Sequence, residues 1–499
     1  MSVIEPHQFK ESGLHAGLQN ESSSPQSPPP PTDPADGEAK LRQKIDLAIV
    51  PLSTLMFLFC FIDRANIGNA RLASFESDLG LKGNDFNSVN SIFFIPYIIL
   101  EVPINILCKR VGPGWFLPTI TILFGLITIA SSWVNSYAQL AVCRFLLGLA
   151  EAGLMPGLSY YLSRWYRRSE LIFRLSMYIS AAPLSGAVGG LLASGILRIP
   201  GFGSFPAGSW RTIFAVEGMI TVLIGIAAMI FLADRPETAR FLNAEEKSLA
   251  ISRVRCERIG GDEVLDSLNL KKLWKGVANP VVLATAVTFL LETITVQGLT
   301  FFAPTIVRTI FPQASVIQQQ LLTVPPYILG FICILAVCYA SWKRQTRQIF
   351  IIVSAPPIMI GYVIFLATVE PVPRYVATFL IASSVFTVGP LCHAQAAANV
   401  NSDSARSMSI AVTMLFGNVA SLISTWSFQS WDGPVYRIGN GLNFATSTTM
   451  MLVAIMALIW MRRDNRARDA RGTRDELRGL SSEQEQELEW NHPDFRWSP

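Results

Sequence analysis

The sequence predicts an all-α integral membrane protein with 12 transmembrane helices in two six-helix halves. Of its 499 residues, 51% are hydrophobic and only 15% are charged, whereas soluble proteins carry roughly 25% charged residues. The apolar residues fall into blocks of about 20, the helical length that crosses a bilayer core. Strands of a membrane barrel would be about 10 residues of alternating polarity. Composition and block length therefore exclude both a soluble enzyme and a barrel.

Six apolar blocks precede a charged stretch at residues 234–278 and six follow it. The blocks lie near residues 46–66, 86–107, 116–134, 137–163, 173–197, 213–233, 279–303, 320–341, 348–368, 374–394, 408–428 and 443–461. Two repeated halves are typical of secondary transporters. We therefore expect bundles at residues 45–233 and 279–461, joined by a cytoplasmic central loop at 234–278.

Both tails are polar. Residues 1–44 include the proline run Pro28–Pro31, and such a composition predicts a disordered tail. Residues 462–499 are charged and form the other tail. With the N-terminus inside, the inner loops hold about 19 lysines and arginines against 7 in the outer loops. This asymmetry predicts a multi-pass membrane protein with both termini cytoplasmic.

Several partner classes have no signal in the sequence. A net charge of +4 and the lack of a basic, aromatic-rich stripe argue against nucleic acid. The seven cysteines show neither a disulfide framework nor zinc spacing. We expect no cofactor, no metal and no catalytic activity, a monomer, and the lipid bilayer as the surrounding partner.

The first block ends in adjacent charges, Asp63 and Arg64, followed by Asn66 and Asn69. Neighbouring helical residues point about 100° apart, so the two charges cannot simply neutralise each other. An ionisable group inside a bilayer costs about 2.5–3.5 kcal/mol on insertion scales. Either these residues form a substrate or proton site, or they anchor the helix at the interface and reach water.

The fourth block places Arg144, Gly148, Glu151 and Met155 on one helical stripe. Arg144 and Glu151 serve substrate binding or coupling, or they form a structural ion pair within the membrane. Small residues at close spacing predict tight helix packing. In the fourth and fifth blocks they are Gly148, Gly153, Gly157, Gly186 and Gly190.

The seventh block carries a polar stripe that includes Thr285, Thr288, Glu292 and Thr295. Such a stripe would be costly against lipid, so we expect it to line a central cavity. Glu292 is either a coupling carboxylate or a hydrogen-bonded structural group. His393, near the end of the tenth block, is more simply explained as a structural residue.

Several motifs resemble one known family. They are Cys60-Phe61-Ile62-Asp63-Arg64-Ala65-Asn66-Ile67-Gly68-Asn69-Ala70-Arg71, Glu101-Val102-Pro103, Arg144-Phe145-Leu146-Leu147-Gly148-Leu149-Ala150-Glu151-Ala152-Gly153, Arg211-Thr212-Ile213-Phe214-Ala215-Val216-Glu217-Gly218 and Gly298-Leu299-Thr300-Phe301-Phe302-Ala303-Pro304. They are similar to the fungal allantoate permease family, the anion:cation symporter branch of the major facilitator superfamily. The resemblance covers roughly residues 40–465.

The resemblance implies the major facilitator fold, alternating access and proton-coupled movement of a small organic anion, such as allantoate, nicotinate or pantothenate, across the plasma membrane. It assigns coupling to Arg144 of the fourth-helix motif. The second half departs from the family pattern: Trp342 and Lys343 follow Ser341 where an acid is usual, and Asn399 is kept while Ser402 replaces a glycine. Asn399 is a further candidate for substrate binding or coupling.

Three other functions compete with anion uptake. The same fold could export a fungal secondary metabolite. A membrane-embedded transferase would need an Asp-Asp-x-x-Asp or His-x4-Asp motif beside a span, and the sequence shows neither. A nutrient sensor would need a long signalling tail.

Overall fold

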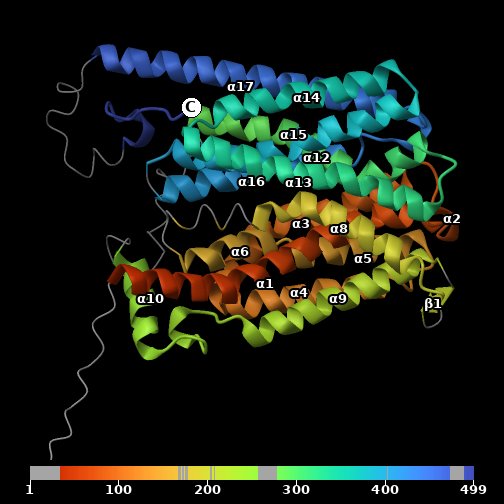
Figure 1. Ribbon diagram of the computed structural model, residues 1–499, viewed down its shortest axis with the longest axis horizontal. Helices are drawn as coiled ribbons and strands as arrows, with labels where there is room; N and C mark the ends of the chain where they lie inside the picture. The colour runs from red at the N-terminus through yellow and green to blue at the C-terminus, as the bar shows by residue number, and fades with distance from the viewer. Residues whose placement is uncertain are drawn as a thin grey trace, which may run out of the picture.

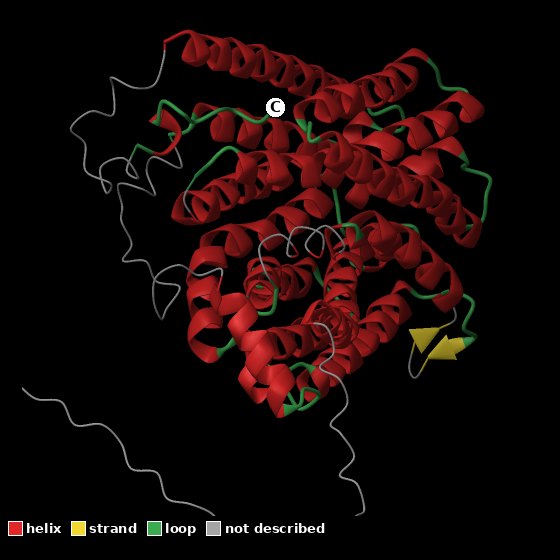
Figure 2. Cartoon of the chain, turned by 60° about the vertical axis from the view of Figure 1, so that its left-hand side comes forward, coloured by secondary structure: helices red, strands yellow, loops and turns green. Residues whose placement is uncertain are grey.

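The computed structural model describes residues 34–166, 170, 174, 178–202, 205–206, 208–256, 278–401, 403–471 and 488–499. Within them the chain is almost entirely helical (Figure 2). Figure 1 shows two groups of long helices side by side, α1 to α10 in one group and α12 to α17 in the other. We call them the N-terminal group and the C-terminal group.

The N-terminal group also contains a two-stranded hairpin. Its elements are α1 (Pro34–Arg71), α2 (Phe75–Asp78), α3 (Asp85–Val111), α4 (Pro113–Ser131), α5 (Tyr137–Glu151), α6 (Leu154–Ser163), α8 (Ala181–Ile196), β1 (Gly201–Phe202), β2 (Phe205–Pro206), α9 (Trp210–Phe231), η1 (Pro236–Thr238) and α10 (Ala244–Cys256). The strands are antiparallel, with Gly201 opposite Pro206 and Phe202 opposite Phe205.

The C-terminal group is helical in every described element. It comprises α12 (Pro280–Ile310), α13 (Val316–Arg344), α14 (Gln348–Ala367), α15 (Pro371–Ala398), α16 (Asp403–Ser424), η2 (Ser430–Asp432), α17 (Arg437–Arg471) and η3 (Glu489–Asn491).

The helices account for the predicted blocks. Among the described residues, nine helices are long and apolar enough to cross a membrane, with α5 and α6 counted as one span. A tenth span is α3, whose two arms meet at 58° beside Pro103, where the helix lacks a backbone donor. The apolar helices α8 and α16 are shorter. The predicted all-α membrane fold is therefore confirmed.

Local sequence sets where several helices begin. Asn279 caps α12 by accepting hydrogen bonds from the backbone of Val281 and Val282, and Pro280 occupies the first turn, where no donor is needed. In α13, Ser315 and Gln318 form a reciprocal capping box. These caps satisfy backbone groups that the apolar blocks themselves cannot.

Two predicted boundaries need correction. Residues 34–44 are helical and belong to α1, whereas the composition predicted a disordered tail up to residue 44. Leu41 is buried, and Lys44 Nζ lies 2.8 Å from Glu246 Oε2 of α10, so packing and charge stabilise this turn. At the other terminus, α17 continues to Arg471, past the predicted end at 461. Residues 1–33, 257–277 and 472–487 of the predicted tails and loop lie outside the described residues.

The two groups meet near α2, which we call the α2 end of the bundle; the opposite end carries α10 (Figure 1). The helix pairs that join the groups are α8 with α13, α1 with α12 and α3 with α16. At the α2 end, Asn87 Nδ2 donates to the carbonyls of Thr425 and Phe428 over 2.6 and 3.2 Å. Gln320 Nε2 donates to the Asn69 carbonyl over 3.0 Å. These bonds hold the groups together at that end.

Candidate functional site

A buried ion pair joins α1 to α5. Arg64 Nε donates a hydrogen bond to Glu151 Oε2 over 2.6 Å, and the Cys60 thiol donates to the same oxygen over 3.2 Å. Arg64 is 7% exposed and Glu151 is 0% exposed. Since neither group can rely on water, each compensates the burial of the other.

Aromatic rings surround the Arg64 guanidinium. Its Cζ atom lies 5.1 Å from the ring centre of Phe61 in α1, and 5.4 and 4.8 Å from the ring centres of Phe93 and Tyr97 in α3. Cations are attracted to aromatic faces at such distances. The result is a fixed positive charge inside the N-terminal group.

The side chains of Asp63 and Asn66 point from α1 in directions different from that of Arg64. Asp63 is 1% exposed and Asn66 is 0% exposed. Asp63 Oδ2 accepts a weak hydrogen bond from Thr221 Oγ1 of α9 over 3.4 Å. Among the described residues, neither amide atom of Asn66 has a hydrogen-bond partner. Of the alternative, an anchor that pairs with a neighbouring helix and reaches water, the pairing is present as Arg64–Glu151, whereas the three side chains are buried in protein.

Arg144 does not form the ion pair with Glu151 that was one alternative: Glu151 Oε2 accepts from Arg64, and Glu151 Oε1 has no hydrogen-bond partner among the described residues. The Arg144 Cζ atom lies 6.0 Å from the ring of Phe214, and Arg144 Nη2 is buried with no hydrogen-bond partner in the described part of the chain. The predicted stripe through Met155 crosses a break, since α5 ends at Glu151 and α6 begins at Leu154 within one span. Pro156 explains the break, since proline fits the first turn of a new helix.

Three glycines lie where α5 and α6 approach their neighbours. A Cβ atom on Gly148 would lie 2.0 Å from the Phe93 carbonyl oxygen of α3. One on Gly153 would lie 2.4 Å from Ile104, and one on Gly157 would lie 2.8 Å from Leu117. At Gly148 the neighbour is backbone, so a side chain there would force α5 and α3 apart; at Gly153 and Gly157 the neighbours are side chains, which would have to shift.

Two further glycines lie between the groups. A Cβ atom on Gly186 of α8 would lie 2.5 Å from the ring of Tyr327 in α13, and one on Gly190 would lie 2.9 Å from Thr323 Oγ1. The contact that these glycines permit therefore crosses from the N-terminal group to the C-terminal group.

A polar contact between the groups also occurs deeper in the bundle. Asn418 Nδ2 of α16 donates to Glu101 Oε2 of α3 over 2.6 Å. Glu101 is half-buried and follows Tyr97 by one helical turn, so it lies on the same side of α3 as a ring that contacts Arg64. The sequence analysis quoted Glu101 in a motif without assigning it a role.

The polar stripe of α12 is buried, and its lining of a central cavity stays a prediction. Glu292 is 4% exposed, and its Oε2 accepts a hydrogen bond from Thr293 over 3.1 Å. Thr285 and Thr288 donate to carbonyls of their own helix. His393 Nδ1 lies 2.8 Å from the Gly389 carbonyl oxygen and its ring packs edge-on against Phe289, as a structural residue would.

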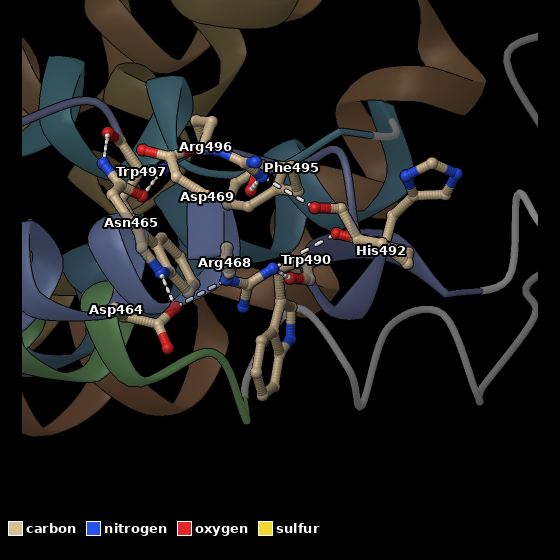
Figure 3. Close-up of polar contacts among 10 residues, drawn as sticks. Asp464, Asn465, Arg468, Asp469, Trp490, His492, Phe495, Arg496 and Trp497 are labelled. Carbon is tan, nitrogen blue, oxygen red and sulfur yellow. Dashed lines mark hydrogen bonds and ion pairs between the residues drawn. The ribbon is translucent and has the colours of Figure 1, made fainter. Parts of the chain in front are cut away.

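Asn399 lies at the α10 end of the bundle and is far in sequence from the charges of α1. Its side-chain amide hydrogen-bonds to the C-terminal segment. It accepts from the Ser498 amide over 2.8 Å and donates to the Ser498 carbonyl over 3.0 Å. Figure 3 shows how the segment is fixed to α17: Trp497 Nε1 donates to Asp464 Oδ2, and the Trp497 amide donates to Asn465 Oδ1. These contacts assign Asn399 to anchorage of the tail; Ser402, the departure beside it, lies outside the described residues.

Glu217 is a buried carboxylate that was not among the residues predicted from the sequence. Glu217 lies in α9, is 0% exposed, and neither of its carboxylate oxygens has a hydrogen-bond partner within the described ranges. Its signal was present, since it is an ionisable residue inside the sixth apolar block. Among the described residues, no group of three or more His, Cys, Asp or Glu side chains could hold a metal ion.

Comparison with known proteins identifies the family. The model of the Major Facilitator Superfamily matches residues 53–425, most of the chain. The chain belongs to the major facilitator superfamily. The buried ionisable groups of α1 and α5, and the bonds that join the two groups of helices, are thus features of a membrane transporter.

Relatives and a solved structure agree with this assignment. An uncharacterised transporter of Schizosaccharomyces pombe is 31% identical, over 86% of this chain and 87% of that protein. The high-affinity nicotinic acid transporter of Saccharomyces cerevisiae is 27% identical, over 94% of this chain and 86% of that protein. The xylose transporter XylE of E. coli, in an inward open conformation, superposes with a TM-score of 0.62 at 14% identity, covering 81% of this chain and 95% of that one. The last likeness confirms the major facilitator fold.

Proposed function

We propose that this transporter moves a small organic anion across the plasma membrane by alternating access, coupled to protons, as the resemblance to the allantoate permease family implied. The observation that supports this most is the Arg64–Glu151 pair, a guanidinium held inside the protein by a single carboxylate. The name of the yeast relative, a nicotinic acid transporter, supports nicotinate among the candidate substrates.

The pair suggests how a proton and an anion could be coupled. While Glu151 is ionised, it neutralises Arg64. A proton on Glu151 removes that negative charge and leaves the guanidinium without its counter-ion. A substrate carboxylate can then take the place of Glu151, because a buried guanidinium needs an anionic partner. Loss of the proton restores the internal pair and releases the anion.

Alternation between two forms is supported by where the groups touch. The hydrogen bonds of Asn87 and Gln320 and the tight contacts of Gly186 and Gly190 all lie toward the α2 end. With the predicted orientation, that end faces outside the cell, so the described form is closed to the outside. Rocking of one group against the other would break these contacts.

Uptake of labelled carboxylates in transport-deficient yeast tests the proposal. The substrates are radiolabelled nicotinate, pantothenate and allantoate, measured at acidic and neutral pH, with and without a protonophore. We expect one of them to accumulate more at acidic pH, and the protonophore to abolish the accumulation. Arg64→Ala should lower uptake about 10- to 150-fold, because a hydrogen bond to a charged group contributes about 1.5–3 kcal/mol.

The matched control is Arg198→Ala, which removes an exposed arginine from the loop after α8 and should leave uptake unchanged. Equal uptake by wild type and Arg64→Ala would reject the role of Arg64. Export of a metabolite is the alternative; it would appear as a compound retained inside cells that lack the protein.

A further inference from the structure

The buried charges of the N-terminal group do not balance. Asp63 and Arg64 of α1, Arg144 and Glu151 of α5, and Glu217 of α9 form a cluster, each 7% exposed or less. Fully ionised, these five groups carry three negative charges and two positive ones, a net charge of −1. Glu101, half-buried beside them, is already bonded to Asn418.

The unbalanced charge lies on Asp63 and Glu217. Arg64 is committed to Glu151, and Arg144 Nη2 has no hydrogen-bond partner among the described residues. Glu217 lies one turn before Thr221, whose hydroxyl reaches Asp63 Oδ2 over 3.4 Å, so a carboxyl group of the same sign lies across the contact between α1 and α9. In the described part of the chain, no hydrogen-bond donor reaches either Glu217 oxygen or Asp63 Oδ1. Ionisation of a carboxyl group that is buried and has no hydrogen-bond donor is highly unfavourable.

The surroundings of the two carboxyl groups are rich in oxygen. Thr221 of α9 lies one turn after Glu217; its hydroxyl donates to the Glu217 carbonyl over 2.9 Å and reaches Asp63 Oδ2 over 3.4 Å. Asn66, one turn after Asp63 on α1, is 0% exposed, and neither of its amide atoms has a hydrogen-bond partner among the described residues. The remaining helices against this site, α4 and α8, have no ionisable residue in their sequences.

We propose that Asp63 and Glu217 together bind one monovalent cation, and that this cation is a proton held between the two carboxyl groups. The proton converts one carboxylate into a neutral carboxylic acid, and the net charge of the cluster changes from −1 to 0. This inference deepens the proposed function and rests on it, because there the proton is the ion that moves together with the substrate. It adds Glu217 to the residues that coupling would require and gives Asp63 a partner in α9.

Infrared spectroscopy of the purified full-length protein in liposomes tests the inference without any substrate. The spectrum of the wild type minus that of Glu217→Gln should contain the carbonyl band of a protonated carboxylic acid at neutral pH. Glu217→Asp, which keeps a carboxyl group, should retain the band. The control Glu245→Gln, at an exposed position of α10, should leave the band unchanged. A band of equal size in wild type and Glu217→Gln would overturn the inference.

Two further arms separate the alternatives. Binding of radioactive sodium that depends on Glu217 would overturn the assignment of the cation as a proton. In transport, Glu217→Gln should reduce proton-driven accumulation at least about tenfold while keeping substrate counterflow, since exchange needs no net proton movement. If wild-type liposomes move no carboxylate but the infrared band still depends on Glu217, the proposed function fails and the shared proton stands. A Glu217→Gln protein with normal driven accumulation would contradict the coupling role.

Discussion

The contact between the two groups at the α2 end can be weakened by one methyl group. A Cβ atom on Gly68 of α1 would lie 2.6 Å from the Phe301 carbonyl oxygen of α12. An ordinary carbon–oxygen contact is about 3.3–3.6 Å, so Gly68→Ala requires α1 and α12 to separate by roughly 0.8 Å. A backbone carbonyl cannot rotate away as a side chain could. The strain falls on the form in which the groups touch there.

The magnitude follows from the cost of overpacking, about 1–3 kcal/mol. If the separated form is free of this strain, Gly68→Ala shifts the ratio of separated to touching forms by about 5- to 150-fold. Spin labels at Lys82, before α3, and Arg437, at the start of α17, report this ratio, since both positions are exposed near the α2 end. We expect a longer-distance population in pulsed electron resonance.

The control is Gly195→Ala in α8, where a new Cβ atom would meet no atom within 4 Å. It should leave the distance distribution unchanged and stabilise its helix by about 0.5–1 kcal/mol. The reasoning is refuted if folded Gly68→Ala protein gives the same distribution as the wild type.

Three further predictions concern other parts of the molecule. Glu151→Gln removes the counter-ion of Arg64 while keeping its shape, and should lower proton-driven carboxylate uptake at least about tenfold, since a hydrogen bond to a charged group contributes about 1.5–3 kcal/mol; normal uptake would contradict this. Deleting residues 489–499 should lower the melting temperature by several degrees, because three hydrogen bonds to the main chain of Ser498, each about 1 kcal/mol, and the buried Trp497 are lost. The pKa of Glu246 is lowered by its hydrogen bond to Lys44. The stabilisation of α10 against α1 should therefore be present at neutral pH and be lost only as the pH falls below the usual range of a glutamate, seen as faster hydrogen exchange in α10.

The truncation and the pH dependence of Glu246 can each be checked with a control variant. Arg496→Ala removes the bond to the exposed Asp469 and the bonds to the neighbouring carbonyls of Pro493 and Phe495, and it leaves Ser498 bonded to Asn399. It should therefore lower the melting temperature less than the deletion does, and an equal loss in both variants would argue against anchorage by Asn399. Lys44→Ala should raise hydrogen exchange of α10 at neutral pH and flatten its pH dependence. An unchanged pH profile in Lys44→Ala would contradict the assignment to this pair.

The fold was largely predictable, because hydropathy reports the membrane directly. Each of the predicted apolar blocks coincides with a helix or, for α5 and α6, with two. The breaks were harder to predict. Residues 34–44 became helical through contacts with α10, which lies about 200 positions away in the chain, and no local pattern announces such contacts.

The site was predictable in part. Asp63, Arg64, Arg144 and Glu151 were found because charges in apolar blocks are costly. The pairing of these residues could not be predicted, since it depends on which helices face each other. Glu151 accepts a hydrogen bond from Arg64 of α1 and forms no ion pair with Arg144 of its own helix. Glu217 satisfied the same criterion as these residues and could have been found by applying that criterion to the sixth block. Asn399 resembled a site residue in sequence, yet its contacts are with the C-terminal segment.

The central claim is that an organic anion and a proton cross together through the buried charges of α1 and α5. Purified protein in liposomes, with nicotinate as the first probe and a pH-sensitive dye inside, measures both fluxes at once. We expect the addition of outside carboxylate to acidify the interior in the wild type and to have no effect in Arg64→Ala. Carboxylate entry in the wild type with no change of internal pH would contradict the account.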